Sequence, residues 1–149
     1  MTTTTTPALT YPYPCPLCGG AVVQRTAANR VRRYHAAAAL PVPDDLPIAT
    51  CDQCQTEWLD AHGATQLDAA LAEVYRRELA DRATRLIARL HATQQVAATE
   101  VALGLTRGYL SRVRAGRKAP SAALVAELAL IAADPPARLA ELRLFWAAV

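Results

Sequence analysis

All four cysteines of this 149-residue chain fall into two Cys-x-x-Cys pairs, Cys15/Cys18 and Cys51/Cys54, separated by 32 residues. Two thiolates three positions apart can bind one ion from a tight turn, and Gly19-Gly20 lets the backbone fold around the first pair. Two such pairs form the tetrahedral all-sulfur set that is typical of structural Zn²⁺. The sequence therefore predicts one structural zinc ion per chain, with Cys15, Cys18, Cys51 and Cys54 as its ligands.

Two other uses of these cysteines have to be weighed. A thioredoxin-type redox pair needs a βαβ scaffold, which the pattern lacks, and it would leave the second pair unexplained. Two structural disulfides would need an oxidising compartment. The scattered histidines His35, His62 and His91 are expected to be ordinary surface or packing residues, because four sulfurs already complete a tetrahedral site.

A second stretch with chemical potential is residues 104–121, GLTRGYLSRVRAGRKAPS, which contains five basic and no acidic residues. Gly104 suits a left-handed turn, Thr106 is a candidate N-cap, and Gly116 suits the end of a helix. Leucines and a valine spaced to face a core complete the pattern, namely Leu105, Leu110 and Val113. The stretch therefore predicts the second half of a helix-turn-helix, with a helix over 107–114.

The polar face of this predicted helix is suited to DNA. An arginine can bind guanine through two parallel hydrogen bonds, and a helix N-terminus flanked by basic residues suits phosphate binding. We expect Arg107 and Arg112 to read bases in the major groove. The predicted DNA-binding residues are Thr106, Arg107, Gly108, Ser111, Arg112, Arg114, Arg117 and Lys118, most of them at phosphates. The alternative is a basic helix face that is simply solvated.

Charge and composition favour a protein that binds a polyanion, and they give no indication of an enzyme or a membrane protein. The net charge of +3 divides into −3 for residues 1–75 and +6 for residues 76–149, and a basic half is typical of a polyanion partner. No Gly-rich phosphate loop, helix-borne His pair or Ser/His/Asp set indicates an enzyme. The chain shows no membrane span and no secretory signal, so we expect a cytoplasmic protein that does not contact membranes.

The elements that must position these residues predict an α+β fold. Residues 1–14 read as a disordered arm, and residues 15–63 as a small zinc ribbon with short antiparallel strands at 21–26, 31–38 and 48–50. A helical pattern over 65–90, opened by a Thr65/Asp68 capping box, provides a connecting helix at 64–81. Residues 82–149 then form an all-α five-helix, repressor-like bundle, with further helices at 94–103, 122–133 and 137–146.

The last predicted helix carries an apolar stripe that ends in Phe145-Trp146. This stripe is large for so small a bundle. It is either local core or half of a dimer interface, and helix-turn-helix proteins use dimers to read two half-sites about one DNA turn apart. We favour a homodimer formed through the C-terminal helices.

The chain resembles the MqsA (YgiT-type) antitoxins of bacterial toxin–antitoxin systems. The resemblance is carried by CPLCGG at 15–20, CDQC at 51–54, YLSRVRAG at 109–116, APS at 119–121 and DPPARLAELR at 134–143. It implies a dimeric repressor that binds an operator in double-stranded DNA, autoregulates its operon and binds a toxin RNase through the ribbon.

The resemblance also implies roles for single residues. Arg112 matches a base-reading arginine, whereas the amide side chain that reads a second base in the family falls on Gly108 here. The pair Thr93-Gln94 lies about two residues further from Gly104 than the family spacing. The alternative is a solitary zinc-ribbon regulator, or a protein-interaction module with weak or no specific DNA reading, which the acidic ribbon and the missing reader at Gly108 support.

Overall fold

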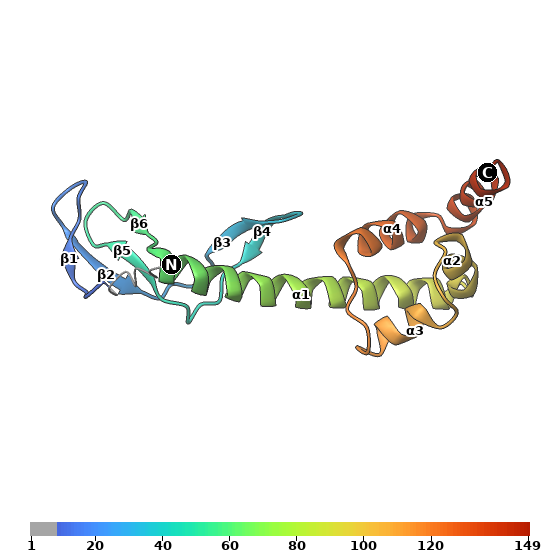
Figure 1. Cartoon of the computed structure of the whole chain (residues 1–149), viewed down its shortest axis with the longest axis horizontal. Helices are drawn as coiled ribbons and strands as arrows, with labels where there is room; N and C mark the ends of the chain where they lie inside the picture. The colour runs from blue at the N-terminus through green and yellow to red at the C-terminus, as the bar shows by residue number, and fades with distance from the viewer. Residues whose placement is uncertain (1–8) are drawn as a thin grey trace, which may run out of the picture. The chain divides into compact units, whose positions relative to one another are not determined.

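The computed structural model describes residues 9–149 and is an α+β protein with a small antiparallel sheet and five helices (Figure 1). The α+β class predicted from the sequence is thereby confirmed. The chain divides into two compact units, one ending at Tyr75 and one spanning Arg76–Val149. The division falls inside the long helix α1 (Ala61–Ala92), within the predicted connecting segment 64–81.

The sheet of the first unit has four strands in the order β1-β2-β5-β6, all antiparallel. Their bounds are β1 Tyr13–Pro14, β2 Ala21–Arg25, β5 Ile48–Cys51 and β6 Glu57–Trp58. Tyr13 and Pro14 belong to the sheet and not to a disordered arm, because they pair with Val22 and Ala21. Residues 1–8 of that predicted arm lie outside the described residues.

A separate two-stranded hairpin is formed by β3 (Val31–Tyr34) and β4 (Ala37–Pro41). The prediction of one continuous strand over 31–38 in a three-stranded sheet is wrong. The backbone reverses at His35, which has a φ of 47°. Strand β2 then pairs directly with β5, and the hairpin packs on the first part of α1 (Figure 1). The buried cluster here joins Leu40 of β4 and the following Val42 to Ile48 of β5 and to Leu67 and Leu71 of α1.

Helix α1 begins four residues earlier than predicted. Asp60 caps it, because its Oδ1 accepts a hydrogen bond from the Gly63 amide at 2.6 Å. The predicted Thr65/Asp68 capping box is wrong, since the Thr65 hydroxyl already bonds back to the Ala61 carbonyl within the helix. In the part of the chain that the structure describes, no helix has both the length and the apolar character needed to cross a membrane.

The second unit contains the remainder of α1 and four shorter helices. These are α2 Val96–Ala102, α3 Tyr109–Arg114, α4 Ala122–Ala133 and α5 Pro135–Ala147. Figure 1 shows α3 and α4 on opposite sides of the second half of α1. One apolar cluster joins them, with Ile87, Leu110 and Leu128 at its centre. Ser121 caps α4 and Asp134 caps α5 through their side-chain oxygens, which explains why the predicted starts of these helices were nearly correct.

Candidate metal centre and candidate nucleic-acid interface

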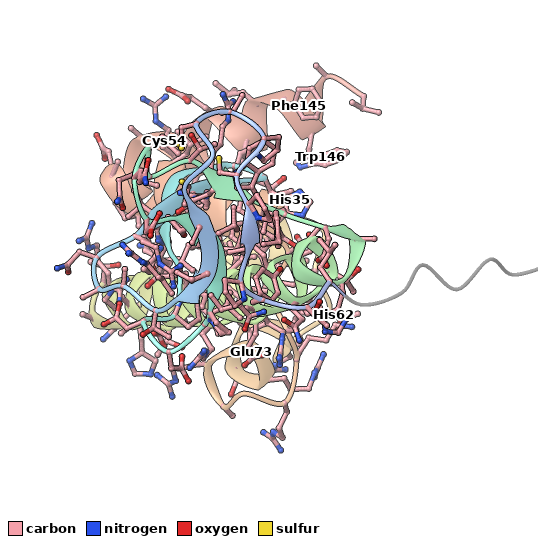
Figure 2. The ribbon with its side chains drawn as sticks, turned by 90° about the vertical axis from the view of Figure 1, so that its left-hand side faces the viewer. His35, Cys54, His62, Glu73, Phe145 and Trp146 are labelled. Atoms are coloured by element: carbon pink, nitrogen blue, oxygen red, sulfur yellow. The ribbon has the colours of Figure 1, made fainter. Side chains whose placement is uncertain are left out.

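The four cysteine sulfurs form one cluster in which every Sγ lies within 4.8 Å of the others (Figure 2, near Cys54). The Sγ–Sγ distance is 3.4 Å for Cys18–Cys51 and 3.8 Å for Cys15–Cys54. A tetrahedral zinc with bonds of about 2.3 Å requires about 3.8 Å between sulfurs. The predicted ligands are therefore brought together at a spacing that can hold a metal ion, two of them buried and two exposed.

Each cysteine pair sits on the same kind of turn. The carbonyl of the first cysteine accepts a hydrogen bond from the amide four residues later. The Gly19 amide donates to the Cys15 carbonyl at 2.8 Å, and the Gln55 amide donates to the Cys51 carbonyl at 3.2 Å. The residue after the second cysteine is left-handed in both turns, with φ 77° at Gly19 and 58° at Gln55. Because β2 pairs with β5 and sets Val22 opposite Cys51, the sheet brings the two turns face to face.

Asp52 and Gly20 join the two turns, a role that the Cys-x-x-Cys spacing did not predict for either residue. The Asp52 carboxylate accepts a hydrogen bond from the Ala21 amide at 2.9 Å. A Cβ at Gly20 would lie 2.8 Å from Cγ of Gln53 and 2.9 Å from Oδ1 of Asp52. Gly20 therefore lacks a side chain because the second turn occupies that space. The position of an acidic residue between the two cysteines of CDQC was the feature of the sequence that could have indicated this role for Asp52.

The thiols of the cluster differ in their pKa values. The Thr56 hydroxyl and backbone amide lower the pKa of Cys54 to about 6. For Cys18, the Gly20 amide lowers the pKa but the neighbouring Cys51 sulfur opposes it, and the net result is a rise to about 12. Closely spaced sulfurs resist carrying negative charge together. A bound cation would remove this repulsion, which is the behaviour expected of a metal site.

The two rival interpretations of the cysteines do not fit this geometry. No disulfide joins the four cysteines, and the sulfurs that lie 3.4 and 3.8 Å apart come from different pairs, not from within one Cys-x-x-Cys turn. A redox dithiol would pair the two cysteines of one motif. As expected, the histidines lie elsewhere: His35 is in the hairpin turn, His62 bonds Gln66 on α1, and His91 is exposed.

Seven of the eight predicted DNA-binding residues are exposed, and Gly108 is half-buried. Leu110 and Val113 point into the core of the second unit, so α3 presents its basic side outward. Arg112 is held at this surface, because its guanidinium donates to the Thr106 hydroxyl at 3.1 Å. The Arg112 Cζ also lies 5.9 Å from the Tyr109 ring centroid, over the ring face.

The start of α3 differs from the prediction. The helix begins at Tyr109, and its N-cap is Gly108 in the left-handed conformation (φ 77°), so Thr106 is not the cap. The carboxylate of buried Glu100 accepts hydrogen bonds from the Gly108 amide at 3.0 Å and the Leu110 amide at 2.9 Å. A carboxylate therefore already occupies these two backbone amides, and they are not open to a phosphate.

A groove of about 540 Å³ lies between α2 and α5 and is lined mostly by apolar atoms of Ala98, Val101, Ala102, Gly104, Arg143 and Trp146. The Trp146 indole Nε1 donates to the Ala102 carbonyl at 2.9 Å and fixes one wall. Beside it, Phe145 packs edge-on against Trp146 and is 60% exposed (Figure 2). The predicted apolar stripe of this helix is thus divided: Leu139 and Leu142 pack on the core of the second unit, whereas Phe145 and Trp146 are exposed.

No protein-family model, curated protein or solved structure matches this chain.

Proposed function

We propose that this protein is a sequence-specific DNA-binding transcriptional repressor with a structural zinc ion in its four-cysteine site. The observation that carries the proposal is the outward basic surface formed by α3 and the turns on either side of it. Between residues 104 and 121 the chain carries Arg107, Arg112, Arg114, Arg117 and Lys118, all exposed, and no acid. The pair α2 and α3, with a left-handed turn at Gly104 (φ 65°), serves as the helix-turn-helix.

In this proposal α3 enters the major groove. Arg107 and Arg112 contact base edges, where a guanidinium matches the two acceptors of guanine. The contacts of Arg112 with Thr106 and Tyr109 hold its side chain at the helix surface before DNA arrives. Thr106, Ser111, Arg114, Arg117 and Lys118 contact phosphates, which orient the protein but carry no sequence information.

The metal has a structural role in this proposal. Four thiolates at zinc-compatible spacing fill a tetrahedral coordination sphere and leave no position for a substrate. When bound, the ion holds the two turns together and so orders the sheet around them. We therefore propose a protein that binds partners and is not an enzyme.

The resemblance to MqsA antitoxins extends the proposal to a partner protein. The unit that ends at Tyr75 carries four arginines against seven acidic residues. An acidic unit complements a basic RNA-cutting toxin, and complementary charge speeds association and selects partners. We propose that this unit binds such a toxin while the second unit represses the operon that encodes both.

Selection of bound duplexes from a random pool, followed by affinity measurements at several salt concentrations, tests the DNA proposal. We expect one recovered sequence that binds at least about a thousandfold more tightly than random duplex. Weak binding that is equal for all sequences and falls steeply with salt would support the protein-interaction module instead. Gly108 favours that alternative, because it has no side chain to reach a base.

The groove between α2 and α5 supports a homodimer. Val101 on α2 is 79% exposed and lines the groove, and Leu144 (73%) and Phe145 (60%) on α5 add to the exposed apolar surface. We infer that a second copy covers it, because a dimer with two α3 helices can read two half-sites. The exposed apolar surface on both helices also fits an isologous contact.

The variant Val101→Glu should weaken the dimer by about 3 kcal/mol, about a hundredfold in dissociation constant, because a carboxylate would be buried without a partner. Sedimentation equilibrium gives the dissociation constant. Leu130→Glu is the matched control, since Leu130 is 66% exposed on α4 and does not line the groove. Equal dimerisation by both variants would contradict an interface at this groove.

A further inference from the structure

We propose that Glu100 is a positioning residue for DNA reading: from α2, its buried carboxylate fixes the start of α3 and thereby the direction of Arg112. This inference rests on the proposed function, which makes α3 the helix that enters the groove. It assigns a role to a side chain that does not itself contact DNA.

The two carboxylate oxygens of Glu100 each accept a hydrogen bond from a backbone amide at the start of α3, a contact that we call the Glu100 clamp. The side chain belongs to a residue that is only 5% exposed. One oxygen accepts from the Gly108 amide at 3.0 Å and the other from the Leu110 amide at 2.9 Å. Both oxygens of a buried acid are thus satisfied by the backbone of the next helix, across the connection 103–108. A charge in this environment is retained because it has these partners.

Helix α3 needs such a clamp. It has only six residues, far fewer than an isolated helix requires to be stable in water. Its N-cap is Gly108, which has no side chain and therefore provides no capping hydrogen bond. The free amides of the first turn must find acceptors elsewhere. The Tyr109 amide bonds the Thr106 carbonyl at 3.0 Å, and Glu100 accepts from the Gly108 and Leu110 amides on either side of it. The negative charge of Glu100 also complements the positive end of the helix.

The Glu100 clamp also determines the position of the Arg112 side chain. The guanidinium of Arg112 bonds Thr106, which lies in the connection that Glu100 spans. A Cβ added at Gly108 would lie 3.6 Å from Nη1 of Arg112, so this glycine borders the guanidinium. The clamped turn therefore sets where Arg112 lies. The same carboxylate occupies the Gly108 and Leu110 amides, so phosphate contacts at the start of α3 fall to side chains and not to these amides.

The test compares Glu100→Ala and Glu100→Gln with Glu127→Ala, an exposed acid on α4. Affinity is measured for the selected duplex and for a random duplex at one salt concentration, well below the melting temperature. Amide hydrogen exchange is measured at Gly108 and Leu110, with Leu128 as the internal reference. Because Gln can accept at one oxygen only, it is the partial rescue of Glu100→Ala.

We expect Glu100→Ala to lose at least about tenfold in affinity for the selected duplex and less for the random duplex. Exchange at Gly108 and Leu110 should quicken while Leu128 stays protected, and Glu100→Gln should recover part of both effects. A lower melting temperature with unchanged sequence preference and unchanged exchange would overturn the proposal. If the wild-type protein shows no preference for any duplex, the proposed function itself fails, and the exchange data then distinguish that failure from loss of the clamp.

Discussion

Removal of the metal by a chelator should disorder the sheet β1-β2-β5-β6 and leave α2–α5 folded. The apolar cluster at this sheet has four buried members, and two of them are the ligands Cys15 and Cys51. The other two, Val22 and Ala49, bury too little surface to order these strands alone. Structural zinc contributes about 10–16 kcal/mol of binding free energy in small metal-dependent domains, which is enough to decide whether they fold.

Amide hydrogen exchange resolves the two units in one experiment. We expect the Val22 and Ala49 amides to lose their protection from exchange when the metal is chelated. The Leu128 amide in the second unit should keep its protection. The variant Cys51→Ser should reproduce the effect without chelator, because it removes one sulfur from the tetrahedral set. Thr50→Ser, on the same strand, is the matched control and should retain metal. Sustained protection of Val22 in metal-free protein would mean that the ion is not structural.

Arg112→Ala should cost about 1–3 kcal/mol in binding to the selected duplex, about 5- to 150-fold in dissociation constant. The loss should come with relaxed preference at one base pair, because in the proposed function the guanidinium reads a base edge and not a phosphate. Fold and stability should change little, since Arg112 is exposed. Affinities for duplexes that carry each of the four base pairs at each position give the measurement.

Two arginine variants separate base reading from general electrostatics. Arg117→Ala should weaken binding uniformly across sequences and lower the salt slope by about 1, as for loss of one phosphate contact. Arg138→Ala should leave DNA binding unchanged, because Arg138 lies on α5 in an ion pair with Glu141. Unchanged preference in Arg112→Ala, or the same uniform loss in all three variants, would remove Arg112 from the base-reading role.

The features that the sequence predicted correctly depend on neighbours in the chain. The Cys-x-x-Cys spacing identified the four sulfurs that cluster within 4.8 Å. The turn glycines Gly104 and Gly116 have φ of 65° and 72°, as a left-handed residue after a helix requires. The helical periodicity placed α4 correctly at 122–133. For the turn glycines and α4 the determining contacts lie within a few residues, so spacing contains the information. Each cysteine turn is local as well, but the two turns meet only because β2 pairs with β5.

The wrongly predicted Thr65/Asp68 capping box is a local error, but three other features that the sequence did not predict depend on contacts between distant residues. The strand expected over 31–38 is a hairpin because its apolar residues pack on α1. Gly108 and not Thr106 caps α3, since Glu100 comes from another helix and satisfies the first amides. The acid Asp52 crosses from the second cysteine turn to the backbone beside the first, 31 residues away.

The sequence by itself therefore determined which residues can bind a metal and which helix carries the arginines. Tertiary structure alone decided how these groups are held: Asp52 and Gly20 fit the cysteine turns together, and Glu100 anchors the start of α3. The physical reason is that helix periodicity and turn chemistry follow from local backbone sterics and hydrogen bonding. A buried carboxylate, in contrast, finds its donors only after the chain has folded and removed water from around it.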